Sequence, residues 1–196
     1  MDIYIDKVKK FNKREDYLID INTARLFLEY CLMSSKTKKI YIIGTGLGGD
    51  TKIIKNLKNY KIIGIESRET FQKEASRVYK KFGGELIKKD LGEFMKLSNK
   101  LSGIFIFIHS INHIPKKQIS LLQKSIKNSF IIIINPNPEI ENIVGKTDQS
   151  VISYLDSKQI QKLLKSKIVF NFFYNPVKIK GKKILLREAL VLKTKD

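Results

Sequence analysis

The sequence predicts an α/β fold: a three-layer sandwich built on a mainly parallel, seven-stranded sheet that ends in a C-terminal antiparallel hairpin. Three observations predict it. Five short apolar runs alternate with amphipathic stretches through the middle of the chain, which is the pattern of successive βαβ units. Two long strand-like segments then close the chain. Finally, a chain of 196 residues, 42% of them hydrophobic, suits one domain with one core.

The five apolar runs have the composition of buried strands. The fourth contains an unbroken apolar stretch from Ile104 to Ile108, as expected for a parallel strand covered on both faces. The first ends at a glycine, the second at Glu66 and the third at Asp90, where loops are expected to begin. The expected strands are Lys39–Ile43, Lys61–Ile65, Glu85–Lys89, Gly103–Ile108, Phe130–Ile134, Lys167–Tyr174 and Lys182–Leu192.

Helix signals fall between these strands. Gly83-Gly84 is a C-terminal stop, Pro115 can open a helix, and Asp156 is an expected N-cap. Asn175-Pro176 and Gly181 supply turn chemistry between the last two strands. The expected helical segments are Thr23–Met33, Gly49–Leu57, Glu69–Phe82, Leu91–Leu97, Pro115–Lys127 and Ser157–Leu164.

Composition bounds the setting and the partners. The single cysteine, Cys31, cannot form an internal disulfide, and no apolar run approaches the roughly 20 residues that span a bilayer. We therefore expect a cytoplasmic protein. The net charge of +19 keeps a nucleic-acid partner open. Nucleic-acid sites usually use arginine, but only five of the 38 basic residues are arginines. The alternative is therefore that the positive charge reflects an excess of lysine in the composition and not a binding surface.

A glycine-rich turn follows the first strand, in the segment Gly44-Thr45-Gly46-Leu47-Gly48-Gly49. Glycines permit a tight turn and close approach of a ligand, and free amides at a helix start attract anionic groups. Glu66 ends the next strand, where a carboxylate can accept hydrogen bonds from two ribose hydroxyls. Together they predict a nucleoside site. The spacing fits both the G-x-G-x-x-G of a dinucleotide site and the G-x-G-x-G of an S-adenosylmethionine (SAM) site.

From Lys39 to about Leu192 the chain resembles a class I (Rossmann-like) SAM-dependent methyltransferase. Besides the glycine turn and Glu66, the resemblance rests on three stretches. Gly83–Leu91 resembles the family's third strand with its terminal Asp. His109–Pro115 is similar to its x-x-x-H-L-P stretch, and Ile131–Pro138 to its apolar run ending in P-N-P.

The resemblance implies SAM as the cofactor, S-adenosylhomocysteine as the product, and a SAM-binding unit over residues 39–196. Residues 1–38 would form an N-terminal helical extension packed on it. Two positions depart from the family: Ile42 and Gly103 stand where many members carry acidic residues, and Asp50 is a candidate to compensate. The implied cofactor-binding residues are Gly44, Thr45, Gly46, Gly48, Asp50, Glu66, Ser67, Asp90, Leu91 and His109.

The catalytic candidates are the two histidines, His109 and His113, which follow the fourth strand. A histidine titrating near neutral pH can take a proton from a hydroxyl or amine; a structural role is the alternative for each. With one cysteine besides, they do not supply a zinc cluster, so we expect no metal. The acceptor is expected to meet the first residues, the His109–His113 loop and the loop Glu139–Tyr154. Tyr4, Tyr17 and Tyr154 are candidates to line its pocket.

The expected function is methyl transfer to a small-molecule or lipid-like acceptor. Three alternatives stay open: an RNA or protein methyltransferase that uses the lysine-rich surface, a non-catalytic nucleoside-binding module, and an NAD-dependent enzyme. The sequence does not indicate the oligomeric state.

Overall fold

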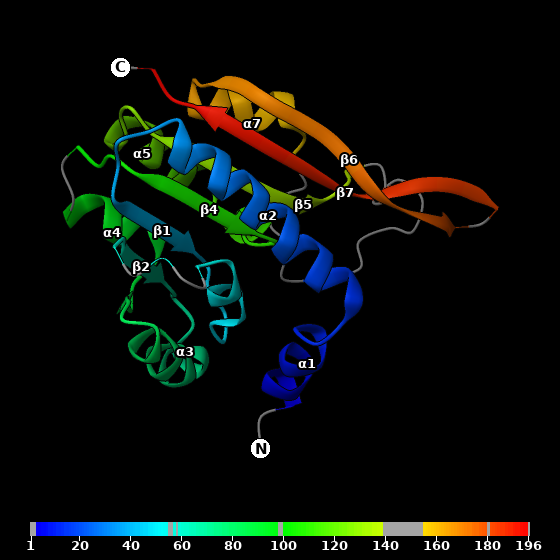
Figure 1. The fold of residues 1–196 in the computed structure, drawn as a ribbon, viewed down its shortest axis with the longest axis horizontal. Helices are drawn as coiled ribbons and strands as arrows, with labels where there is room; N and C mark the ends of the chain where they lie inside the picture. Colours follow the sequence, from blue (N-terminus) through cyan, green and yellow to red (C-terminus); the bar gives the residue numbers. More distant parts are fainter. Residues whose placement is uncertain are drawn as a thin grey trace.

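The structure, a computed structural model, describes residues 3–54, 57, 59–97, 100–138, 155–179 and 181–195. It is built on one seven-stranded sheet with the order β3-β2-β1-β4-β5-β7-β6 (Figure 1). Strands β1 to β5 are parallel, and β7 is antiparallel to both β5 and β6. The predicted fold class is therefore confirmed. The strands are β1 (Lys39–Ile43), β2 (Lys61–Ile65), β3 (Glu85–Ile87), β4 (Ile104–Ile108), β5 (Phe130–Pro136), β6 (Lys167–Ile179) and β7 (Lys182–Lys193).

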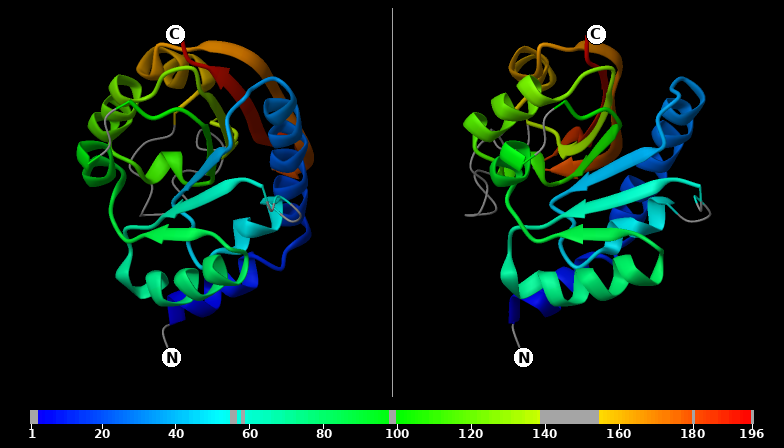
Figure 2. Two further views of the ribbon diagram at one scale, coloured as in Figure 1. Left: turned by 60° about the vertical axis from the view of Figure 1, so that its left-hand side comes forward. Right: turned by 90° about the vertical axis from the view of Figure 1, so that its left-hand side faces the viewer.

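Helices cover both faces of this sheet, as the two turned views in Figure 2 show. Successive residues of a strand point to opposite faces, so each apolar strand supplies two cores. In β1, Ile40 and Ile42 pack beneath α2, whereas Tyr41 and Ile43 pack against α4 and α5. The helices are α1 (Ile3–Phe11), α2 (Glu15–Met33), α3 (Glu69–Lys81), α4 (Leu91–Leu97), α5 (Lys116–Ser125) and α7 (Ser157–Leu164), with two 3₁₀ turns, η1 (Gly49–Ile54) and η2 (Ile111–His113).

The amino-terminal helices extend beyond Thr23–Met33, the segment expected from the apolar pattern. Helix α2 begins at Glu15, not at Thr23, because Tyr17, Asp20 and Ile21 also lie on its buried face. Helix α1 precedes it, within residues 1–38, the stretch expected to form a helical extension. None of the helices that the structure describes has the length and hydropathy of a membrane-spanning segment.

The helical segment expected at Gly49–Leu57 is a 3₁₀ turn that ends at Ile54. The amide and the hydroxyl of Thr51 both donate to the carbonyl of Gly48, at 3.2 and 2.7 Å. Such i to i+3 bonding closes the tighter 3₁₀ turn and leaves a short connector.

The closing hairpin is longer than expected, because β6 continues through Asn175-Pro176 to Ile179. Pro176 pairs with Leu185 of β7 without breaking the register. A proline lacks the amide needed for a second neighbour, but β6 is the last strand of the sheet among the described residues, with no described strand on that side. The turn falls at Gly181, where φ is +80°.

Candidate functional site

A cavity of about 580 Å³ opens at the carboxyl ends of β1, β2 and β4, within the size range of ligand sites. Helix α1 and the start of α2 close one side of it. Ligands of open α/β sheets bind at this edge. Of the residues predicted from the sequence, it is lined by Gly44, Thr45, Gly46, Asp50, Glu66, Ser67, Asp90, Leu91, His109 and His113. Gly48 stands behind the turn, where an added Cβ would lie 3.1 Å from Val78.

The glycine turn has the backbone that only glycine adopts easily. Gly44, Gly46 and Gly48 have φ values of 71°, 55° and 82°. A Cβ on Gly44 would lie 2.6 Å from the Cβ of Ser110, so the turn also passes tightly against the loop after β4. A Cβ on Gly46 would meet nothing within 4 Å, which leaves its backbone open to the cavity.

Glu66 ties the turn to the end of β2. Its Oε2 accepts a 2.7 Å hydrogen bond from the Gly46 amide, and its Oε1 accepts one of 2.8 Å from the Arg68 amide. The side chain is only 4% exposed, and burial raises the pKa of Glu66 despite these amides. A carboxylate offers about four acceptor sites, so Glu66 keeps acceptor capacity for a ligand beside these backbone amides.

Three residues that line the cavity each carry a buried polar atom with no hydrogen-bond partner among the described residues: Oδ1 of Asp50, Oγ1 of Thr45 and Oγ of Ser110. Asp50 is 5% exposed; burial raises its pKa well above the ordinary value, and the charge of Glu66 raises it further. Buried polar groups are rarely left unpaired in native proteins. A ligand that brings donors or a positive charge would satisfy this wall.

Asp90 and Leu91 lie where α4 begins. Oδ1 of Asp90 accepts a 2.8 Å hydrogen bond from the Glu93 amide, so Asp90 caps the helix while its carboxylate also lines the cavity. The two departures from the family have structural reasons. Ile42 is fully buried beneath α2, and a Cβ on Gly103 would lie 2.7 Å from the ring of Tyr41.

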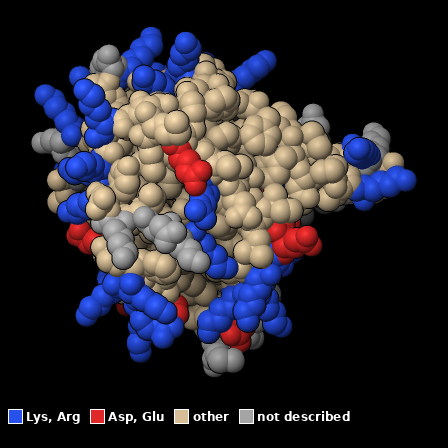
Figure 3. Space-filling model, in the orientation of Figure 1, with Lys and Arg blue, Asp and Glu red and all other residues tan. Residues whose placement is uncertain are grey.

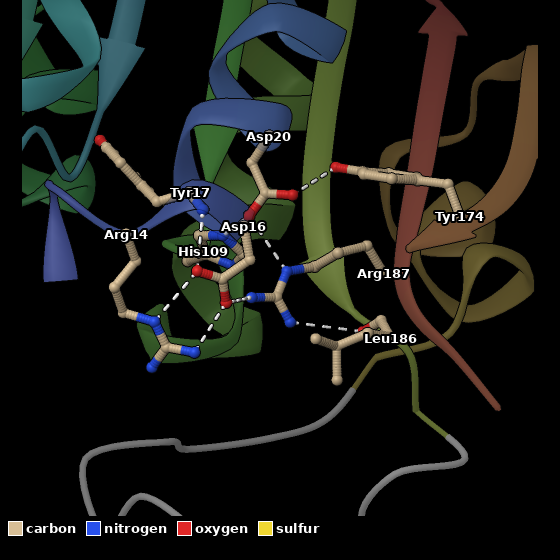
Figure 4. A network of polar contacts seen from close by, with 8 residues as sticks. All are labelled: Arg14, Asp16, Tyr17, Asp20, His109, Tyr174, Leu186 and Arg187. Carbon is tan, nitrogen blue, oxygen red and sulfur yellow. Dashed lines mark hydrogen bonds and ion pairs between the residues drawn. The ribbon is translucent and has the colours of Figure 1, made fainter. Parts of the chain in front are cut away.

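A polar network that the sequence did not reveal holds His109 (Figure 4). Nε2 of His109 lies 2.7 Å from Oδ2 of Asp20, which is fully buried on α2. Tyr174 of β6 donates to Oδ1 of the same carboxylate at 2.6 Å, and Arg187 of β7 donates to Oδ2 at 3.0 Å. Arg187 also reaches Asp16 at 3.3 Å. The network thus joins the loop after β4 to α2 and to the hairpin.

The charges in this network set the protonation of the histidine. Burial raises the pKa of Asp20, but hydrogen bonds and charges from His109, Arg187 and Tyr174 outweigh it and lower the pKa overall. Burial lowers the pKa of His109, and the charge of Arg187 adds to this, although Asp20 raises it. The geometry therefore favours an ionised Asp20 and a neutral His109 near pH 7. With Nε2–H donating to Asp20, Nδ1 carries the lone pair.

Aromatic side chains surround His109 on the cavity side. The Phe11 ring meets it edge-on at 5.8 Å between centroids, and Tyr17 lies 6.5 Å away. Val8, Phe11 and Tyr17 line the cavity, so Tyr17 lies where the acceptor was expected. The side chains of Tyr4 and Tyr154 and the loop Glu139–Tyr154 lie outside the described residues. His113 lines the same cavity from η2.

No protein-family model matches the sequence, and no curated protein matches it significantly. Solved structures do match. A SAM-dependent methyltransferase from Archaeoglobus fulgidus is 17% identical, with a TM-score of 0.74 over 98% of this chain and 100% of that one. One from Clostridium acetobutylicum is 13% identical, with a TM-score of 0.67 over 100% of both chains. One from Aquifex aeolicus is 17% identical, with a TM-score of 0.63 over 99% of both.

The chain has the class I methyltransferase fold. The likeness covers the whole chain in these comparisons, including α1, α2 and the closing hairpin. In the class I methyltransferase fold seen here, β7 lies antiparallel between β5 and β6. The doubly wound dinucleotide-binding sheet has the order 3-2-1-4-5-6 instead. The fold thus agrees with the family resemblance.

Proposed function

We propose that the protein is a SAM-dependent methyltransferase that acts on a small-molecule or lipid-like acceptor. The observation that carries this proposal is the cavity wall at the glycine turn. There, Asp50 Oδ1 is buried without a partner in the part of the chain that the structure describes, and Asp50 lines the cavity together with Glu66 and the open backbone of Gly46. A nucleoside with a cationic amino-acid tail supplies what this wall lacks: hydroxyls for Glu66 and a positive charge for Asp50.

The residues present fit that cofactor. The backbone of Gly44–Gly48 would hold its amino-acid portion, and the remaining lone pairs of Glu66 would accept the ribose hydroxyls. Asp90 would accept the adenine amino group, and Asp50 the ammonium, in place of an acidic residue at Ile42. When bound, SAM supplies a methyl group already activated on a sulfonium sulfur, so the protein mainly orients the acceptor and excludes water.

His109 is proposed as the general base for an acceptor that carries a proton. Asp20 fixes the ring so that Nδ1 keeps its lone pair, and the lowered pKa keeps the imidazole neutral and able to accept a proton. The proton of an acceptor hydroxyl or amine would pass to Nδ1. Asp20 is a positioning residue in this scheme. His113 remains a second candidate base at the same cavity.

The proposed acceptor class rests on the residues that line the cavity on the side closed by α1 and α2. Val8, Phe11 and Tyr17 are apolar or aromatic there, and Phe11 and Tyr17 pack around the ring of His109. Such a wall suits a compact molecule or an acyl chain and excludes water from the reacting groups.

A thermal-shift experiment with SAM, S-adenosylhomocysteine and NAD tests the cofactor. A ligand that binds the native state raises Tm with its affinity and concentration. We expect shifts with SAM and S-adenosylhomocysteine but not with NAD. Glu66→Gln should reduce those shifts. Glu85→Gln is the control, because Glu85 lies outside the cavity in an exposed pair with Lys61. A shift with NAD alone, or none with either methyl-transfer ligand, would refute the proposal.

An RNA acceptor is the second candidate, favoured by a groove of about 470 Å³ between α5 and α7. Four lysines line it, with no carboxylate among the described lining residues: Lys116, Lys124, Lys162 and Lys165. RNA binding that weakens steeply with added salt would favour this candidate. Saturable, salt-insensitive binding of a small acceptor would favour the first.

A further inference from the structure

An exposed apolar patch runs along the outer side of α2 and onto β6. We call it the aromatic patch and define it by Leu26, Tyr30 and Met33 of α2 and Phe170 and Phe172 of β6. Their exposed fractions are 68%, 37%, 90%, 41% and 41%. Solvent-exposed apolar groups are ordinary when scattered, but a contiguous patch marks a surface for interaction.

The patch is contiguous because of helix geometry and direct ring contacts. Leu26, Tyr30 and Met33 are spaced by four and three residues, so they share one side of α2, opposite its buried side. Tyr30 meets the Phe170 ring at 4.8 Å between centroids. Phe27, beneath them, stacks on Phe170 at 5.9 Å and touches Phe172 at 5.5 Å.

The packing of the described residues does not account for the patch. A helix at the surface of a globular protein normally pairs an apolar face with a polar one. Helix α2 instead buries one apolar side on the sheet and exposes a second. In addition, β6 is the edge strand of the sheet, where natural proteins usually avoid exposed aromatic residues. We therefore expect a binding partner to cover the patch.

Lysines lie at the end of the patch where α2 stops. Lys36, Lys38 and Lys39 follow α2 and are exposed, and the exposed Lys167 begins β6. Nζ of Lys193 lies 5.6 Å from the ring of Phe130, which in turn touches Tyr30. In Figure 3, basic side chains gather beyond the carboxyl end of α2, and the face beside the helix is largely uncharged.

We propose that the aromatic patch docks on an anionic membrane surface. Exposed aromatic and aliphatic groups next to lysines have the chemistry of a surface that inserts apolar side chains below anionic headgroups. A second copy of this chain is disfavoured as the occupant, because both partners would carry a net charge of +19. Helix α2 also carries Tyr17 and Asp20 of the candidate site, so docking would set the cavity at a fixed height above the membrane.

Single-tryptophan reporters test this docking, because the native chain contains no tryptophan. Met33→Trp places the reporter in the patch. Leu97→Trp is the matched control on α4, since Leu97 is 70% exposed outside the patch. With vesicles of equal parts phosphatidylcholine and phosphatidylglycerol, we expect a blue shift of the Met33→Trp emission only. Phosphatidylcholine vesicles should shift neither.

Vesicle sedimentation of the full chain measures the strength of docking. Leu26→Ser with Met33→Ser should weaken binding to the anionic vesicles at least about tenfold, because two exposed apolar side chains can no longer insert. Phe82→Ser with Leu97→Ser, exposed apolar residues elsewhere, should leave it unchanged. Thermal unfolding checks that each variant folds. The proposal is wrong if the patch variant binds like the native chain, or if the native chain is a dimer that this variant dissociates.

Discussion

His109 combines a left-handed backbone, which is uncommon outside glycine, with a place in a largely buried polar network. Its φ is +54°, in the left-handed region that costs most residues energy. Its amide donates to Ile134 at 2.8 Å and its ring to Asp20, so bonds at both ends hold it there. Strain of this kind persists at sites where a side chain must be aimed, which agrees with the proposed role as a base.

Replacing His109 should change how stability depends on pH. The pKa of His109 is lower folded than unfolded, so the unfolded chain binds more protons as pH falls through about 6.5. That part of the stability is present at higher pH and lost on acidification, by at most about 1.4 kcal/mol per pH unit. Because asparagine tolerates the left-handed backbone, His109→Asn is the suitable variant.

Denaturant unfolding between pH 5.5 and 8 measures this effect. His109→Asn should show a flatter loss of stability toward low pH than the native chain. The raised pKa values of Asp50 and Glu66 change stability with pH in the opposite direction. Both carboxyl groups are present in the native chain and in the variant, so they do not account for a difference between the two curves. Parallel pH curves for the two proteins would contradict a partly buried, neutral His109.

Asp20 should be among the most costly side chains to remove. Asp20→Ala leaves Arg187, whose side chain is 8% exposed, with only Asp16 as a carboxylate partner, and breaking a buried pair of this kind costs up to about 3–5 kcal/mol. Glu29→Ala is the control, because its pair with Arg25 is about half exposed and contributes less than about 1 kcal/mol. Chemical unfolding of both variants gives the comparison. Equal losses would mean that the network is not coupled to the fold.

Gly83 and Gly44 have similar backbone conformations but different surroundings. Comparing their alanine variants therefore separates the cost of backbone strain from the cost of a steric clash. Gly83→Ala, at φ +74° with open space around it, should cost about 1 kcal/mol. Gly44→Ala, at φ +71°, adds a Cβ 2.6 Å from Ser110 and should cost at least about 1 kcal/mol more. Unfolding gives the energies, and calorimetry with S-adenosylhomocysteine should show lost binding only for Gly44→Ala. If both variants bound S-adenosylhomocysteine equally well, the glycine turn would not be part of the binding site.

At the scale of helices and strands, the sequence predicted the features that depend on local patterns of residues. All seven strands and the Asp156 cap were found from apolar runs and turn residues. The end of β6 was missed because Asn175-Pro176 normally indicates a turn, and a proline is excluded from a strand that has neighbours on both sides. Only the strand order shows that β6 lies at the edge of the sheet, where a proline is tolerated. The Asp20–His109 pair was missed because 89 residues separate its members, and no local pattern reports such a contact.

The start of α7 offers a test of a local prediction. Oδ1 of Asp156 accepts a 2.8 Å hydrogen bond from the Gln159 amide, and the Gln159 side chain accepts one from the Asp156 amide at 3.2 Å. Asp156→Ala should therefore cost about 1 kcal/mol in unfolding free energy. Asp156→Asn, which can cap equally well, should cost much less. A loss of the same size in both variants would show that charge, and not capping, stabilises the helix start.

At the scale of the whole molecule, the sheet order brings separated parts of the sequence to one edge. The glycine turn, Glu66, Asp90 and His109 meet because β1, β2, β3 and β4 are parallel neighbours, as the apolar runs and strand-end residues predicted. The contribution of α1 and α2 could not be predicted in the same way. Their residues reach the cavity only through packing of the amino-terminal helices, which leaves no periodic signal at Phe11 or Asn12.

The central claim is that the cavity binds a nucleoside through the glycine turn and the acidic strand ends. A crystal structure with S-adenosylhomocysteine tests it most directly. We predict the adenosine between Glu66 and Asp90, with the ammonium at Asp50 Oδ1. A structure in which the ligand occupies another part of the molecule, or in which side chains fill the cavity and exclude it, would contradict the account.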